Sequence, residues 1–283
     1  MSCVVVHVVG RDEAELRFPF LLISTSTKQQ GEGKDMDEHK FEYAVVGGSS
    51  LLESSFFKSL TLRVVETELG NVNLYFGPDF IFCQRHHADP AREYTQPHNI
   101  NYRAIALALK KEGVSKVISF GSVGSLRKDI RPGTVVIPDD YFNLWNIISL
   151  YDDARAHLVA EINAELRQEI INVLKEHKEK LPPFELREGG TYVQTRGPRF
   201  ETKAEIKVLA GFGELVAMTG AHEVTIYTEG GLKVAMVNMV DNMGNGLGDT
   251  TLSFAEFKEG VRKNEATVEA ILGVLLTHFL KRK

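Results

Sequence analysis

One segment of the chain reads Val234-Ala235-Met236-Val237-Asn238-Met239-Val240-Asp241-Asn242-Met243-Gly244-Asn245-Gly246. Its first seven residues are largely apolar at both odd and even positions. This pattern predicts a strand that is covered on both faces of a sheet. Lys116–Phe120 has the same character. Because ligands of open α/β sheets bind beyond the carboxyl ends of strands, the polar residues that end this segment are candidate binding residues.

Further strands and helices alternate along the chain. Short β-branched or aromatic runs predict strands at Tyr43–Val46, Leu60–Glu66, Val72–Tyr75, Phe80–Gln84, Lys116–Phe120, Thr134–Pro138, Thr191–Gln194, Leu215–Met218 and Leu232–Val240. Apolar positions near a period of 3.6 predict helices at Tyr102–Glu112, Ala160–Glu179, Phe200–Ala210, Glu223–Glu229 and Ser253–Lys281. The last helix should begin with a capping box of Ser253 and Glu256. The alternation predicts an α/β fold with a mixed central sheet flanked by helices.

The first 40 residues differ from the rest in composition. Cys3–Val9 and Glu15–Ser24 are expected to be extended, and residues 25–40 are polar and contain glycine, as flexible linkers do. We therefore expect an N-terminal extension over residues 1–40 and one domain over residues 41–283.

The overall composition is that of a globular protein. Of the 283 residues, 43% are hydrophobic and 25% are charged, and the net charge is −5. The negative charge disfavours nucleic acid as a partner. Apolar runs are too short to span a membrane, and we expect no signal peptide. The two cysteines form no zinc motif, which favours a cytoplasmic protein and predicts no metal site.

Small and basic residues follow several of the predicted strands. Gly47-Gly48-Ser49, Gly121-Ser122 and Met218-Thr219-Gly220 offer backbone N–H groups and hydroxyls to an anion. Arg85 and His86 add donors suited to phosphate. Each turn alone is equally typical of an ordinary loop, but together they predict an anion site along one sheet edge.

Two further side chains suit the edge of a purine. Pro198 predicts the start of a helix, which would turn Phe200 and Glu201 toward the crevice. Phe200 can stack on a flat base, and Glu201 can accept from ring N–H groups. Asn242 donates and accepts, so it can bind both a 6-oxo group and N7. These residues, with the anion site, favour an enzyme that splits a nucleoside.

From Phe41 to its end the chain resembles the trimeric purine nucleoside phosphorylases and methylthioadenosine phosphorylases. The resemblance rests most specifically on Gly189–Glu205, which contains Gly197-Pro198-Arg199-Phe200, and on Met218-Thr219 and Glu223. It implies a single, partly barrel-like domain and a homotrimer or a dimer of trimers. It also implies a nucleoside and phosphate as substrates, with no cofactor.

The resemblance assigns roles to individual residues. Phosphate would be bound by Ser49, Arg85, His86, Ser122 and Thr219. The base and sugar would contact Phe200, Glu201, Met218, Asn242 and Gly244. Of these, Asn242, His86 and Ser122 would act in catalysis.

The choice of purine depends on Asn242, which lies 24 residues after Met218 in the slot for a base-reading residue. An amide can donate to a carbonyl oxygen, whereas an ionised carboxylate cannot, so Asn242 favours a 6-oxopurine. Asp241 stands one position earlier, and a shift of one residue would restore the 6-amino purine of methylthioadenosine phosphorylases.

The 5′ end of the nucleoside distinguishes subfamilies. Leu252–Phe257 offers no histidine for a 5′-hydroxyl, and Phe254 and Phe257 provide an apolar wall that suits a methylthio group. The chain thus most resembles methylthioinosine phosphorylase, with His157 as a second candidate at the 5′ pocket. We expect the substrate to be a 5′-methylthio or an ordinary 6-oxopurine nucleoside. The alternatives are a methylthioadenosine phosphorylase and a non-catalytic nucleoside-binding relative, while a hydrolase is disfavoured.

Overall fold

The computed structural model describes residues 41–52, 54–248 and 251–280. The predicted extension over residues 1–40 lies outside the described residues. Strands are β1 Tyr43–Gly47, β2 Thr61–Thr67, β3 Gly70–Phe76, β4 Phe80–Gln84, β5 Lys116–Ser125, β6 Thr134–Ile137, β7 Asp140–Phe142, β8 Glu185–Glu188, β9 Thr191–Gln194, β10 Leu215–Ala217 and β11 Lys233–Met243. Helices are α1 Tyr102–Lys111, α2 Ala164–His177, α3 Lys203–Leu209, α4 Gly220–Glu229 and α5 Phe254–Leu280.

The strands form one mixed sheet, with the order β2-β3-β4-β1-β5-β10-β9-β7 along its main path. A branch at β5 adds β11, β6 and β8. The centre is parallel, because β5 pairs in parallel with both β1 and β11. The predicted α/β fold with a mixed sheet flanked by helices is confirmed.

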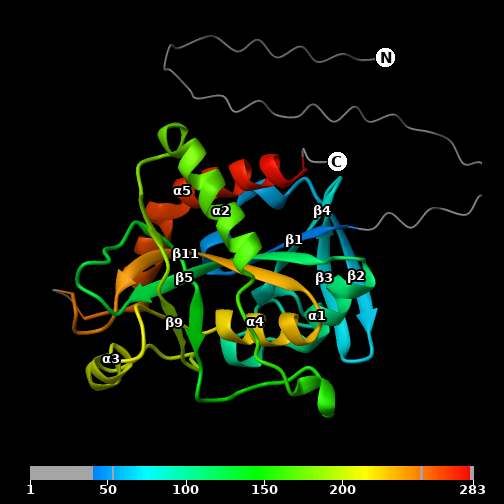
Figure 1. The fold of residues 1–283 in the computed structure, drawn as a ribbon, viewed down its shortest axis with the longest axis horizontal. Coiled ribbons are helices and arrows are strands. Elements are labelled where there is room, and N and C mark those ends of the chain that lie inside the picture. The colour runs from blue at the N-terminus through cyan, green and yellow to red at the C-terminus, as the bar shows by residue number, and fades with distance from the viewer. Residues whose placement is uncertain (1–40, 53, 249–250, 281–283) are drawn as a thin grey trace, which may run out of the picture. The chain divides into compact units, whose positions relative to one another are not determined.

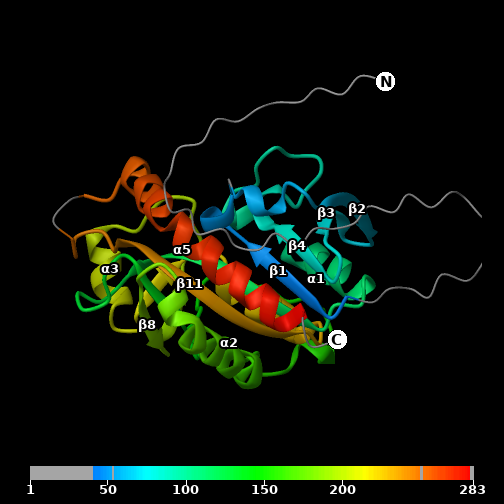
Figure 2. The same ribbon diagram turned by 90° about the horizontal axis from the view of Figure 1, so that it is seen from above.

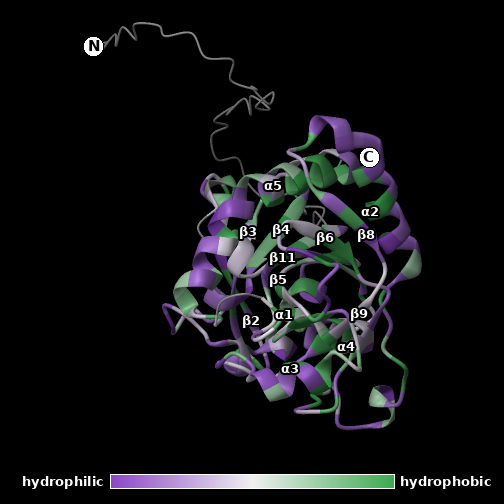
Figure 3. Cartoon of the chain, turned by 90° about the vertical axis from the view of Figure 1, so that its left-hand side faces the viewer, coloured by the Kyte–Doolittle hydropathy of each residue, from purple (hydrophilic) through white to green (hydrophobic). Residues whose placement is uncertain are grey.

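Helices cover both faces of the sheet. Figures 1 and 2 show α2 and α5 side by side on one face, with α1 and α4 on the other. The strands between them are apolar, and outward-facing parts of the helices are hydrophilic (Figure 3). In β11, Val234–Asp241 is buried without interruption. The two-sided apolar pattern therefore does correspond to a covered central strand.

Strand β5 continues further than predicted. β5 does not end at Phe120 but extends through the expected small-residue turn to Ser125, where it pairs with β11 and β10. Glycines permit this pairing, since a Cβ at Gly121 would collide with the Asn238 side chain and one at Gly124 would lie 3.1 Å from Asn242 Nδ2. Ser122 is consequently a strand residue and not a turn residue.

The expected helix at Phe200–Ala210 is shorter than predicted. Helix α3 begins at Lys203, and Thr202 is its N-cap in a capping box with Glu205. Phe200 and Glu201 therefore lie in the extended segment before the helix, because the side chain of Thr202, and not Pro198, caps its first turn. At α5 the predicted box is confirmed, with Ser253 N–H donating to Glu256 and Glu256 N–H donating to Ser253 Oγ.

Candidate active site

The parallel strands β1 and β4 end side by side, next to the middle of β5. Gly47 of β1 is in register with Gln84 of β4, and Val46 of β1 is in register with Ser119 of β5. The glycine turn after β1 and the Arg85–His87 turn after β4 therefore lie at the same sheet edge. The Gly121-Ser122 segment, predicted as a further turn at this edge, lies instead within β5.

Gln84 connects the two turns. This buried side chain donates to the Gly48 carbonyl at 3.1 Å and accepts from the His86 N–H at 3.2 Å. Ser49, half-buried, begins the short 3-10 helix that follows the glycines. Sequence reasoning missed Gln84, since a glutamine at the end of a strand carries no motif.

Arg85 is buried in a network of hydrogen bonds. Its Nε donates to Glu223 of α4 at 2.6 Å, and its Nη2 donates to Glu223, Ser119 and the carbonyls of Val46 and Phe120 at 3.0–3.2 Å. Glu223 also accepts from the Ser119 hydroxyl. The guanidinium is thus fixed in one orientation by a fully buried carboxylate.

One nitrogen of Arg85 faces the glycine turn. A Cβ at Gly48 would collide with Nη1, so only glycine fits there. None of the Arg85 hydrogen bonds within the described part of the chain uses Nη1. Because Glu223 balances the positive charge of Arg85, an anion here would meet a directed donor and not an unpaired cation.

His86 is buried beside this network with its proton position fixed. Nδ1 lies 2.9 Å from the Thr95 carbonyl oxygen, which only accepts, so Nδ1 carries a hydrogen. The ring stacks on Tyr94 with centroids 5.0 Å apart. Burial, with smaller effects of Arg85 and His87, lowers the pKa of His86 to about 4. At neutral pH the ring is therefore uncharged.

Ser122 and Asp241 lie between the anion-site residues and Asn242. The Ser122 hydroxyl donates to one carboxylate oxygen of Asp241, and Asn264 of α5 donates to the other at 2.7 Å. A bulge between Val240 and Asn242 shifts the register of β11 at this point. Since both Asp241 oxygens are occupied, Asn242 is the better placed of the two to read a base.

Asp241 should make stability depend on pH. Burial raises the pKa of Asp241 from 3.8 to about 6. The folded state therefore binds the proton more strongly, and this favourable contribution, complete below pH 4, is lost as the pH rises through 6. The free energy of unfolding should fall by about 3 kcal/mol over that interval from this group.

The Asp241→Asn variant should lack this dependence. Urea unfolding of both proteins at pH 4, 5, 6 and 7 should show the wild type losing stability relative to the variant as the pH rises. Two parallel pH profiles would contradict the assignment.

Glu201 is buried and held from two sides. Thr195 Oγ1 donates to its carboxylate at 2.6 Å, and Asn245 Nδ2 donates to its backbone oxygen at 3.2 Å. Burial raises the pKa of Glu201. Asn245 follows Asn242 by three residues, so this contact joins the end of β11 to the Glu201 segment. Asn242 itself lies against Gly124 of β5 and donates to the Met243 carbonyl.

Met218 and Thr219 lie beside the Glu201 segment. A Cβ at Gly197 would collide with Met218 Sδ, and Thr195 N–H donates to the Ala217 carbonyl at 2.8 Å. Thr219 precedes α4, and its backbone N–H donates to the Tyr192 hydroxyl. Gly244 packs tightly, since a Cβ there would lie 2.9 Å from the Ser125 carbonyl oxygen.

Three aromatic rings meet at the start of α5. Phe200 and Phe257 have centroids 5.7 Å apart, and Phe254 stacks on Phe257 at 6.1 Å. The structure thus joins the expected base-stacking residue to the expected 5′ wall. His157 is exposed in the loop after Ala154–Ala156, and its role at the 5′ pocket stays a prediction.

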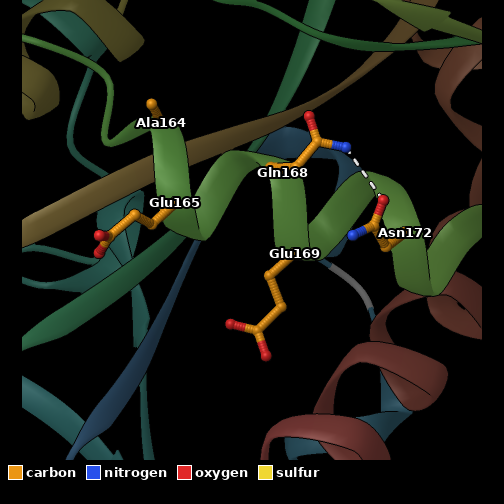
Figure 4. A pocket seen from close by; sticks show the side chains of 5 residues that line it. All are labelled: Ala164, Glu165, Gln168, Glu169 and Asn172. Atoms are coloured by element: carbon orange, nitrogen blue, oxygen red, sulfur yellow. Dashed lines mark hydrogen bonds between the residues drawn. The ribbon is translucent and has the colours of Figure 1, made fainter.

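A wide hollow of about 620 Å³ lies elsewhere, on the surface of α2 (Figure 4). It is open to solvent, and Glu165 points away from Gln168, which donates to Asn172. Its lining contains none of the residues predicted from sequence. We therefore place the candidate site at the strand ends.

Most of the chain matches a known family. A model of the family described as the phosphorylase superfamily matches residues 42–277. The chain belongs to this superfamily. The family predicted from the sequence is thereby confirmed.

Individual members of the phosphorylase superfamily are similar over most of the chain. A probable 6-oxopurine nucleoside phosphorylase of Archaeoglobus fulgidus is 34% identical over 78% of this chain and 89% of its own length. A probable S-methyl-5′-thioinosine phosphorylase of Methanocaldococcus jannaschii is 31% identical over 78% and 86%. The methylthioadenosine phosphorylase of Schistosoma mansoni, solved in complex with adenine, has a TM-score of 0.72 at 23% identity over 86% and 93%. The last comparison shows the shared fold.

Proposed function

We propose that the protein is a pentosyltransferase that cleaves a purine nucleoside with inorganic phosphate, giving the free purine and a pentose 1-phosphate. One observation carries this proposal: the Asn242–Asn245 segment at the end of β11 packs on the buried Glu201 segment, beside Met218. Asn242, which can bind a heterocycle, and the buried Glu201 carboxyl thereby lie on segments that contact each other. The superfamily membership supports the same activity.

The proposed reaction divides these residues into two groups. Ser49, Arg85 and His86 hold phosphate, with Ser122 and Thr219 nearby on β5 and before α4. Asn242 stabilises negative charge on the leaving purine, and Glu201 binds the ring. Positioning and electrostatics then supply most of the rate enhancement, with phosphate as co-substrate and without a cofactor.

A 6-oxopurine is the preferred base in this proposal. The Asn242 amide can donate to a 6-oxo group, and Asp241 is occupied by Ser122 and Asn264. The relatives described as 6-oxopurine and methylthioinosine phosphorylases support it. The alternative, a 6-amino purine, is supported by an S-methyl-5′-thioadenosine phosphorylase of Hyperthermus butylicus that is 32% identical.

The 5′ group in this proposal is a methylthio group. The contact of Phe257 with Phe200 and Phe254 makes an apolar wall, where an unpaired 5′-hydroxyl would cost about 1–3 kcal/mol.

The Phe257→His variant should therefore gain activity on 5′-hydroxyl nucleosides relative to their methylthio analogues. The ratio of kcat/KM for inosine to that for methylthioinosine should rise by about tenfold or more. Phe212→His, at a 42% exposed position outside this wall, is the matched control. An unchanged ratio in the Phe257 variant would place the 5′ end elsewhere.

We also propose that the protein is a cytoplasmic homotrimer or a dimer of trimers. Leu144, Ile147 and Val159 are 60%, 68% and 80% exposed on the segment between β7 and α2. Exposed apolar side chains on this segment support a surface that another chain covers. The mass in solution, measured by light scattering, would be expected at three or six times 31.6 kDa.

The test of the function is a panel of inosine, guanosine, adenosine and their 5′-methylthio analogues, with and without phosphate. We expect release of the free purine only with phosphate, and fastest from the 6-oxopurines. Release without phosphate would indicate a hydrolase. Tight binding without release would indicate a non-catalytic nucleoside-binding protein.

A further inference from the structure

The first half of α5 is not anchored in the hydrophobic core. No residue of 254–267, all of which the structure describes, is buried, and the buried part of α5 begins at Val268. The core therefore fixes only the second half of this helix. The first half nevertheless carries Phe257, whose ring contacts Phe200 in the apolar wall. Contacts other than apolar burial must hold Phe257 in place.

Gly260 and Asn264 hold this half of α5 against β11. A Cβ at Gly260 would lie 2.1 Å from the Asp241 backbone oxygen, so helix and strand approach to a distance that only glycine allows. One turn further along, Asn264 Nδ2 donates to the Asp241 carboxylate at 2.7 Å and to the Val240 carbonyl at 3.3 Å. The spacing of Phe257, Gly260 and Asn264 places all three on one face of the helix.

Asp241 is the fixed side of this contact. The segment Val234–Asp241 of β11 is buried without interruption, and the strand pairs with β5 and β6. Asn242 follows Asp241 directly in the chain. On the helix, Phe257 lies about one turn before Gly260. The contact of helix and strand therefore sets the distance between the proposed base-reading amide and the apolar wall.

We propose, resting on the function proposed above, that Gly260 and Asn264 are positioning residues that limit the length of the 5′ substituent. They hold α5 at its closest approach to β11, so the wall leaves room for a methylthio group and not for a longer alkylthio group. Selection of the 5′ group then depends on a main-chain contact as well as on the aromatic rings.

The Gly260→Ala variant tests this. The added methyl group must move about 1 Å or more away from the Asp241 oxygen to reach an ordinary contact. The helix should move, because its first half is not buried whereas β11 is paired on both sides. We expect kcat/KM for a 5′-propylthio nucleoside to rise about tenfold relative to its methylthio analogue, since two more methylenes then find room. The change should lie in KM, with kcat for the methylthio substrate within about threefold of the wild-type value.

Gly273→Ala is the matched control on the same helix. No described atom would lie within 4 Å of a Cβ at Gly273, so the ratio should equal that of the wild type. Both substitutions raise helix propensity equally, so a difference between them reports the contact with Asp241. Asn264→Ala removes two hydrogen bonds without adding a clash, and its ratio should rise in the same direction. An unchanged ratio in Gly260→Ala, or in Asn264→Ala where Gly260→Ala does not fold, would overturn the proposal.

Binding measurements separate this proposal from the proposed function. The dissociation constants of the same nucleosides, made with hypoxanthine and with adenine, are measured by isothermal titration calorimetry without phosphate. A protein that binds them with the expected shift but cleaves none would refute the proposed function and leave the positioning role standing. Cleavage by every variant with an unchanged ratio would refute the positioning role alone, and binding of no nucleoside would refute both.

Discussion

The Arg85→Met variant should lose both stability and phosphate-dependent turnover. Removing Arg85 leaves Glu223 as an uncompensated charge in a fully buried position. The free energy of unfolding should fall by about 3–5 kcal/mol, as it does when one partner of a buried ion pair is removed. Turnover should fall by about 100- to 1,000-fold, because a directed donor to the phosphate is lost. Urea unfolding and initial rates at varied phosphate concentration measure the two effects.

A double variant separates the two roles of Arg85. Adding Glu223→Gln removes the stranded charge and keeps a side chain that the Ser119 hydroxyl can contact. The double variant Arg85→Met/Glu223→Gln should therefore recover most of the lost free energy of unfolding. Its phosphate-dependent turnover should remain as low as that of Arg85→Met. If the double variant regains activity together with stability, Arg85 does not bind phosphate and only supports the fold.

The Asn242→Asp variant should reverse the preference for the base. An ionised carboxylate repels a 6-oxo group and accepts from a 6-amino group, so the ratio of kcat/KM for 6-oxo to 6-amino nucleosides should fall by about two orders of magnitude. The ratio is measured with inosine and adenosine and with their methylthio analogues.

The controls for this variant test position and charge. Asn172→Asp adds the same charge on the exposed surface of α2, and its ratio should equal that of the wild type. Identical ratios in Asn242→Asp and the wild type would remove Asn242 from the base site.

The sequence predicted secondary structure well wherever the determining residues are close together in the chain. Phe80–Gln84 and Thr191–Gln194 are strands with the predicted bounds, since β-branched and aromatic runs fit a covered sheet. The capping box at Ser253 was also predictable from two residues. By contrast, β7 and β8 were missed because their burial pattern is mostly exposed or intermediate and they carry no apolar run.

Long-range contacts explain the other differences. β5 continues past Phe120 because β11 and β10 offer it hydrogen bonds, which no local rule reveals. The Glu223 carboxylate beside Arg85 lies 138 residues away in sequence, so only the fold shows that the cation is balanced. Ser122 was predicted as a site residue because of its hydroxyl. Its hydrogen bond to Asp241 was not predictable, because Asp241 lies at a bulge in β11. His157 is exposed in a loop, so no contact within the described part of the chain tests its predicted role.

A crystal structure with phosphate and hypoxanthine bound is the most direct test of the account. We expect Asn242 within hydrogen-bond distance of the 6-oxygen and N7, the Glu201 carboxylate on a ring N–H, and phosphate beside Arg85 Nη1 and His86. Hypoxanthine bound away from both Asn242 and Glu201 would contradict the account.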